Sequence, residues 1–324
     1  MHKAGAILLL FLCILAVSSG CTGTAPAASG TPVLTPSPVA SLPLATPVAA
    51  ANLTPAPVLQ NLSVFFIPVG QGDSILVITP NKKTLLIDAG RQDAAPDVIR
   101  LLKRENVSVL DIALATHAHG DHIGGMPEVL ENFPAREFVW NGHPRKAMPY
   151  INLMDEIAKK KIPLTAVSAG DTISLDPELS LAVLNPPEPG FDDQNNNSIV
   201  LRMTYRNVSF LFAGDAAQES EASMLAGNMT LAADILKVGH HGNVHSTGAE
   251  FLTAVHPTLA IIEVGDAAEG HHPSEKTLAR LAKENVTVYR TDRDGIVEVS
   301  TNGTGYAVAT FPAVSAMPAA QASA

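Results

Sequence analysis

The chain has 324 residues, enough for one large domain or two small ones. It carries 21 Lys and Arg against 31 Asp and Glu, which gives a formal net charge of −10 at pH 7. This balance argues against a protein that binds nucleic acid through a general basic surface, although metal ions can supply local positive charge. The two cysteines, Cys13 and Cys21, lie near the N-terminus, so any metal farther along the chain must be held by nitrogen and oxygen.

Residues 1–21 have the pattern of an export signal. Lys3 precedes the apolar stretch 4–17, which is shorter than the roughly 20 residues that a membrane-spanning helix needs. The small residues before Cys21 resemble a lipoprotein signal of bacteria and archaea, in which that cysteine is lipidated. Ser18 stands where such signals usually have an aliphatic residue, so ordinary secretion is the alternative. We expect an exported protein, anchored to the outer face of the membrane through Cys21.

Composition divides the rest of the chain into three parts. Residues 22–60 are rich in Pro, Ala and Thr, which leaves no periodic apolar face and predicts a disordered tether. Residues 61–312 alternate short apolar runs with helical stretches and predict one α/β domain. Residues 313–324, rich in Ala and Ser, predict a disordered tail.

The first part of the domain alternates strands with one amphipathic helix. Val98, Leu101 and Leu102 have the i, i+3, i+4 spacing of a helix face. The predicted elements are strands at 62–68, 74–78, 84–88 and 112–115, and a helix at 94–105.

The segment after the strand at 112–115 contains a cluster of possible metal ligands. It reads T-H-A-H-G-D-H-I-G-G over 116–125. Because alternate residues of an extended segment point the same way, His117 and His119 can meet on one ion, while Asp121 and His122, beyond the bend, can meet on a second. Imidazole and carboxylate suit zinc, manganese or iron. The sequence therefore predicts a metal site on this loop, and the two glycines lead into a helix.

Further polar residues stand where later strands end. A predicted hairpin, 198–205 and 208–213, ends in Asp215; the strand 235–238 ends in His240 and His241; the strand 259–264 leads to His271 and His272. An α/β layered fold can gather such loops around a rigid core. The remaining predicted elements are helices at 217–226 and 274–284, the latter with Ser274 and Thr277 in capping-box positions, and strands at 286–289, 296–300 and 306–310.

Taken together, these motifs resemble the metallo-β-lactamase superfamily, and within it the lactamase-type domain of the competence protein ComEC and its free-standing relatives. The resemblance rests on four motifs: V-G-Q-G-D-S at 69–74, L-I-D-A-G at 86–90, N-N-N-S-I-V at 195–200 and K-V-G-H-H-G at 237–242. They follow the family's order across residues 62–311. The resemblance implies an αββα sandwich of two mixed sheets with outer helices and metals between the sheet edges.

The resemblance also implies roles for the polar residues. His117 and His119 would bind a first metal, Asp121 and His122 a second, and Asp215 both. One of the two histidines at 240 and 241 would complete the second metal, and the sequence does not choose between them. The superfamily's third histidine for the first metal is missing, because the segment 195–198 stands there instead. One or two ions per chain, Zn²⁺ or Mn²⁺, are therefore expected.

Other residues are expected to support the metal ligands or meet the substrate. Asp73, Asp88 and Asn197 would stand behind the ligands, since a carboxylate behind a metal-bound imidazole fixes its tautomer. Asp121, Asp215 and His272 are the expected catalytic residues; His272 would contact substrate or stabilise charge, or alternatively cap the helix at 274. Three further histidines of the domain, His143, His245 and His256, are interpreted as structural or surface residues.

Three functions remain open from the sequence. The first is an extracytoplasmic hydrolase of phosphodiesters, DNA or other, that uses a metal-activated water. The second is a hydrolase of esters, lactones or β-lactams. The third is a ligand-binding lipoprotein with a weakened site. Expected partners are a phosphodiester substrate, small or nucleic acid, and a membrane through the lipid; no obligate protein partner is inferred. Fold alone does not decide among the functions.

Overall fold

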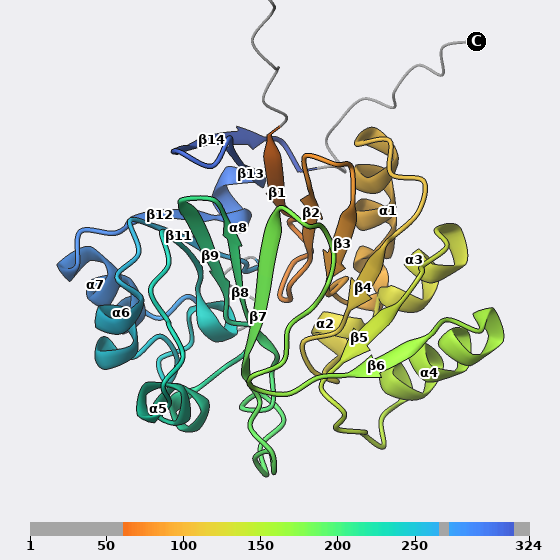
Figure 1. Ribbon diagram of the computed structural model, residues 1–324, viewed down its shortest axis with the longest axis horizontal. Helices are drawn as coiled ribbons and strands as arrows, with labels where there is room; N and C mark the ends of the chain where they lie inside the picture. Colours follow the sequence, from red (N-terminus) through yellow and green to blue (C-terminus); the bar gives the residue numbers. More distant parts are fainter. Residues whose placement is uncertain (1–60, 266–271, 314–324) are drawn as a thin grey trace, which may run out of the picture. The chain divides into compact units, whose positions relative to one another are not determined.

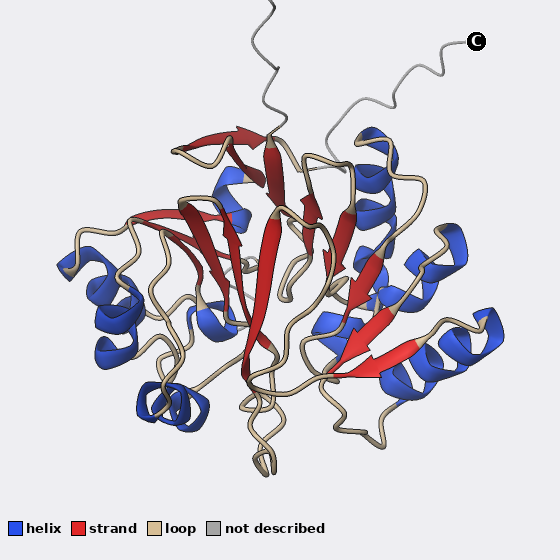
Figure 2. Cartoon of the chain, viewed as in Figure 1, coloured by secondary structure: helices blue, strands red, loops and turns tan. Residues whose placement is uncertain are grey.

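Two mixed β-sheets face each other, and helices cover their outer faces (Figures 1 and 2). The computed structural model describes residues 61–265 and 272–313. The predicted signal with Cys21, the tether, His271 and nearly all of the predicted tail lie outside these residues. The α/β sandwich predicted from the sequence is confirmed.

Within the described residues, the larger sheet has eight strands and the smaller has six. The order in the larger sheet is β14 (Tyr306–Phe311), β13 (Ile296–Thr301), β1 (Leu62–Phe66), β2 (Ile75–Ile78), β3 (Thr84–Ile87), β4 (Ile112–Leu114), β5 (Phe138–Trp140) and β6 (Leu164–Ala166). The order in the smaller sheet is β12 (Thr287–Arg290), β11 (Leu259–Ile262), β10 (Ile235–Lys237), β9 (Val208–Phe212), β8 (Val200–Tyr205) and β7 (Leu179–Asn185).

Each sheet contains a block of parallel strands. Strands β3 to β6 pair in parallel in the larger sheet. Strands β9 to β12 do so in the smaller one. All other pairings are antiparallel. Carboxyl ends of parallel strands lie at one edge of a sheet, so each block gathers its following loops at one place.

Both faces of the central strands are apolar because the middle of each sheet is covered on both sides, whereas the edge strands β6 and β14 are largely exposed or half-buried. In β1, Val64 and Phe66 point between the sheets, whereas Phe65 points outward to the helices. In β9, Phe210 lies between the sheets and Leu211 faces the helices of the other side. This alternation produces three apolar layers, one between the sheets and one under each set of helices.

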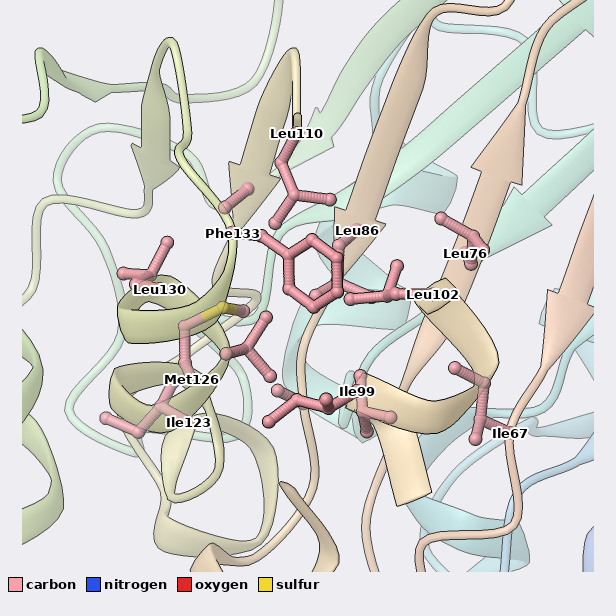
Figure 3. Close-up of a cluster of buried hydrophobic side chains, with 14 of the residues drawn as sticks. Ile67, Leu76, Leu86, Ile99, Leu102, Leu110, Ile123, Met126, Leu130 and Phe133 are labelled. Atoms are coloured by element: carbon pink, nitrogen blue, oxygen red, sulfur yellow. The ribbon is translucent and has the colours of Figure 1, made fainter. Parts of the chain in front are cut away.

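The helices follow the same division. Figure 3 shows Ile99 and Leu102 of a helix, and Phe133 just after another helix, packed in one cluster with Leu76 and Leu86 of the larger sheet. The larger sheet is covered by α1 (Ala95–Arg104), α3 (Met126–Asn132) and α4 (Met148–Lys160), with the one-turn helix α2 (Gly120–Ile123) beside them. The smaller sheet is covered by α5 (Gln218–Ala226), α6 (Ala249–Val255) and α7 (Glu275–Lys283), and α8 (Thr291–Asp294) leads into β13.

The predicted helices and strands are present, and their ends differ by one or two residues. The predicted capping box is only half formed. The Ser274 side chain accepts the backbone N–H of Thr277, but the Thr277 hydroxyl donates to the backbone oxygen of Asn243. Among the described residues, no helix combines the length and apolarity needed to cross a membrane.

Candidate metal centre

The loops at the carboxyl ends of the parallel strands bring the predicted metal residues together. His117, His119, Asp121 and His122 follow β4 in the larger sheet. From the smaller sheet come Asp215, after β9, and the two histidines of the 3₁₀ turn η2 (Gly239–Gly242), after β10. Residues far apart in sequence therefore meet between the edges of the two sheets.

The first group of possible ligands contains His117, His119 and Asp215. His117 Nε2 lies 3.0 Å from His119 Nδ1 and 3.7 Å from Asp215 Oδ2. Donor atoms around a tetrahedral zinc ion, at about 2.0–2.1 Å from the metal, stand roughly 3.3 Å from one another. The three side chains therefore have the spacing that one ion requires.

The second group contains Asp121, His122 and His241. His241 Nε2 lies 3.7 Å from Asp121 Oδ2. Asp215 faces this group too, because its Oδ1 lies 3.3 Å from His122 Nε2 and 3.4 Å from His241 Nε2. The two oxygens of Asp215 thus point to different groups, which is the arrangement expected of a carboxylate shared by two ions.

Three buried polar atoms at the second group have no hydrogen-bond partner among the described residues: Nε2 of His122 and of His241, and Oδ1 of Asp215, which faces them. Buried polar atoms nearly always have a partner, so three unpartnered atoms that face one another require an explanation. Their lone pairs suit a divalent cation. The residues present therefore fit a metal ion at this position.

Supporting contacts fix the imidazoles. Asp88 accepts three hydrogen bonds: from His122 Nδ1 at 2.8 Å, from the Thr116 N–H at 2.8 Å and from the Thr116 hydroxyl at 2.6 Å. His241 Nδ1 donates to the backbone oxygen of Glu263 at 3.0 Å. Each bond places the proton on Nδ1 and leaves Nε2 facing the centre, as a metal ligand requires.

The charges of the centre are strongly coupled. Burial, together with His122, lowers the pKa of His117 to about 3, so this imidazole is neutral. Although burial opposes it, the carboxylates of Asp215 and Asp88 raise the pKa of His122 well above its usual value. Asp215 raises the pKa of His241 to about 9 against the same opposition. Bound cations would compete with these protons for the negative charge of the same carboxylates.

The turn at 239–242 separates the adjacent histidines that the sequence could not assign. His240 and His241 have φ values of 47° and 53°, two consecutive left-handed residues that are unusual outside glycine. His241 is buried in the second group. His240 is partly exposed, with Nε2 3.7 Å from Asp215 Oδ2 on the side of the first group. The ring of His272 lies 6.0 Å from that of His240, at the rim of the centre.

Two charged residues beneath the centre were not predicted. Lys237, in β10, is fully buried; it forms an ion pair with Asp73 and donates to the backbone oxygen of Gly214 at 3.1 Å. Glu263, also fully buried, accepts the backbone N–H of Ser74 at 2.9 Å. Burial and Asp73 raise the pKa of Glu263 well above its usual value. The signal was a single charge inside an apolar strand, which requires a buried partner.

The predicted supporting residues lie in different places. Asp73 lies below His241, 3.2 Å from its Nδ1, and is paired with Lys237. The Asn197 amide binds the backbone of Phe191, and the contact with His117 comes from Ser198, whose hydroxyl lies 3.3 Å from His117 Nδ1.

The Ser198 hydroxyl also accepts the backbone N–H of Asp215. Of the three histidines interpreted from the sequence as structural or surface residues, His143 packs against Gly190, and His245 and His256 are exposed.

Comparison with known proteins agrees with this geometry. The sequence profile of the metallo-beta-lactamase superfamily matches residues 67–265, and the chain belongs to that superfamily. It is a metal-dependent hydrolase of this class, whose fold implies binding of divalent metal.

Three relatives illustrate the similarity. The chain is 30% identical to ComE operon protein 3 of Bacillus subtilis (strain 168), over 72% of this chain and 32% of that protein. It is 29% identical to competence protein ComA of Neisseria gonorrhoeae, over 71% and 31%. It is also 30% identical to a hydroxyacylglutathione hydrolase of Nitrosomonas eutropha, over 48% and 50%. The chain thus spans about a third of the length of the two competence-related proteins.

Proposed function

We propose that this protein hydrolyses phosphodiester bonds outside the cytoplasm with Zn²⁺ or Mn²⁺. The observation that carries the proposal is the position of Asp215, whose two oxygens face two separate groups of possible ligands. A pair of ions suits phosphodiester hydrolysis, because both the attacking and the leaving oxygen develop charge. The motifs resemble the ComEC-type domain, and this resemblance implies a nuclease role, which favours a phosphodiester over an acyl substrate; the relatives matched over most of the domain are of the same kind.

In this proposal, His117 and His119 would hold a first ion, Asp121, His122 and His241 would hold a second, and Asp215 would contribute to both. Bound divalent ions supply Lewis acidity at the phosphoryl group and make water a usable nucleophile near neutral pH. The protein fixes the imidazoles through Asp88 and the backbone of residue 263, so little reorganisation is needed on binding.

The two histidines at the rim are proposed to act on the substrate side. His240 is 24% exposed at its side chain, and its Nε2 faces Asp215 from the solvent side. His272 lies beside it. Both can donate a hydrogen bond to a phosphoryl oxygen, which stabilises the charge that develops during hydrolysis.

The test combines metal analysis with activity of the full chain. We expect one or two equivalents of metal by mass spectrometry of the elements, and hydrolysis of bis(p-nitrophenyl) phosphate or plasmid DNA that chelator abolishes and added metal restores. Metal binding without any hydrolysis of phosphodiesters would contradict the proposal and favour a ligand-binding protein.

A second candidate is ester or thioester hydrolysis. The match to a hydroxyacylglutathione hydrolase, although it covers only 48% of this chain, favours it over hydrolysis of lactones or β-lactams. Rapid cleavage of a glutathione thioester, with no cleavage of phosphodiesters by the same metal-loaded sample, would replace the first candidate with this one.

We further propose export and lipid anchoring at Cys21, on the basis of the signal-like residues 1–21 and the Pro-rich segment 22–60. Mass spectrometry of the mature N-terminal peptide tests this. A peptide that begins at another residue and carries no lipid would contradict anchoring and leave secretion.

A further inference from the structure

A groove of about 890 Å³ opens beside Asp121 at the edge of the metal centre. This volume lies within the range of about 300–1,000 Å³ that is typical of sites for small molecules. Its walls come from the segment 91–93 after β3, from the turn at 120–124 and from the start of α4. Because Asp121 belongs to both the groove and the second ligand group, the groove adjoins the metal centre and offers room for the part of a substrate next to the bond at the metals.

Besides Asp121, the polar lining of the groove combines amides, two carboxylates and one arginine. Gln71, Gln92 and Asn152 offer amides. Arg91 is the one cation among the described lining residues, and its Nε lies 3.3 Å from a carboxylate oxygen of Asp93. Glu128 adds an exposed carboxylate. Leaving out Asp121, one arginine against two carboxylates gives the lining a formal charge of −1.

This lining does not suit the sugar–phosphate backbone of a nucleic acid strand. A strand carries a negative charge at every nucleotide, and proteins that bind strands neutralise these charges with Lys and Arg. A phosphate next to the scissile one would meet the carboxylates of Asp93 and Glu128, with Arg91 already paired. Arg145 and Lys146 are exposed on the loop before α4, but they do not line the groove.

We propose that the groove receives an uncharged, hydrogen-bonding group of a substrate that contains a single phosphodiester, such as a nucleoside, rather than the next phosphate of a polynucleotide. The amides of Gln71, Gln92 and Asn152 can donate to and accept from such a group. This inference rests on the proposed phosphodiesterase function, because it assumes that a phosphodiester occupies the metal centre.

The experiment compares thymidylyl-thymidine, which has one phosphodiester and no other charge, with an oligothymidylate. For the full chain loaded with Mn²⁺ at low salt, we expect kcat/KM per bond to be at least about tenfold higher for the dinucleotide. This ratio should fall as added salt screens the carboxylates. Equal or better cleavage of the oligothymidylate overturns this inference alone. Hydrolysis of neither substrate overturns the proposed function and this inference with it.

A charge reversal in the groove sharpens the test. Glu128→Lys should raise cleavage of the oligothymidylate relative to the dinucleotide by about tenfold, since attraction replaces repulsion. The matched control is Glu284→Lys, at the exposed end of α7 over the other sheet (Figure 1), which should leave the ratio unchanged. Circular dichroism checks the fold of both variants. A ratio that Glu128→Lys leaves unchanged contradicts the inference.

If Glu128→Lys fails to fold, Asp93→Asn provides a second variant. It removes the carboxylate paired with Arg91, so it should move the ratio in the same direction. An unchanged ratio in this variant likewise overturns the inference.

Discussion

Replacing Lys237 with methionine should lower the free energy of unfolding by about 3–5 kcal/mol, the usual cost of leaving one partner of a buried ion pair uncompensated. The Lys237 side chain is fully buried, and the Asp73 carboxylate that it pairs with is 1% exposed. Methionine fills a similar volume but leaves that carboxylate without its cation. Gly214 also loses a donor to its backbone oxygen, next to Asp215.

A double mutant separates the charge from the packing. In Lys237→Met with Asp73→Asn, the unpaired charge is removed, so the loss should fall below about 2 kcal/mol, with a coupling energy of at least about 1 kcal/mol. A matched control is Lys83→Met, which breaks the partly exposed ion pair with Asp111 (3.0 Å); because Asp111 keeps Arg136 as a partner, the loss should be about 1 kcal/mol or less.

Urea denaturation of the metal-free proteins measures all four variants, the two single variants of the pair, their double variant and Lys83→Met, on one scale. The reasoning is refuted if the single variant Lys237→Met loses no more stability than Lys83→Met. It is also refuted if the losses of Lys237→Met and Asp73→Asn simply add in the double variant, because an ion pair predicts that they do not.

Further predictions concern the metal, pH and anchoring. Asp215→Ala should leave the circular dichroism spectrum unchanged while metal content falls and hydrolysis drops by several orders of magnitude; unchanged hydrolysis would reject the centre. Asp176 accepts the Thr79 hydroxyl at 2.5 Å, and although burial opposes it, this bond lowers the pKa of Asp176. A lowered pKa stabilises the fold above the unfolded value of about 3.9 and is lost as pH falls through the folded value. Asp176→Asn should therefore cost about 1–2 kcal/mol near pH 7 and progressively less below about pH 4, measured by urea midpoints; a loss independent of pH would contradict this. Cys21→Ala should release the protein from membranes into the medium, as judged by fractionation, whereas unchanged membrane association would argue against the lipid anchor.

The spacing of polar residues predicted a metal site on the loop at 116–125, and the family resemblance added Asp215 and one of the two histidines at 240 and 241. His117 to His122 follow a buried strand, and the loop after such a strand lies at a sheet edge, so the geometry follows from the sequence. The assignment of His241 rather than His240 to the second group could not be predicted. It depends on two left-handed residues in succession, and no local sequence preference favours that conformation here.

Three strands between the metal loop and residue 198, β5, β6 and β7, were not predicted, and for two of them the physical reason is their length. Strands β5 and β6 have three residues each, too few to show a period of two. Lys237 and Glu263 were overlooked because each is one charge within an apolar run. Their partners, Asp73 and Ser74, lie in the loop just before β2 of the larger sheet, and only tertiary structure brings them together.

Each ligand group takes side chains from both sheets, and this has a mechanical consequence. His117 and His119 belong to the larger sheet and Asp215 to the smaller; Asp121 and His122 belong to the larger and His241 to the smaller. An ion in either group would therefore link the two sheets. Its bonds to the ligands would break if one sheet slid over the other. Loss of metal should weaken the packing between the two sheets before it affects the hydrogen bonding within either sheet. Hydrogen exchange should then rise first in the strand ends next to the centre.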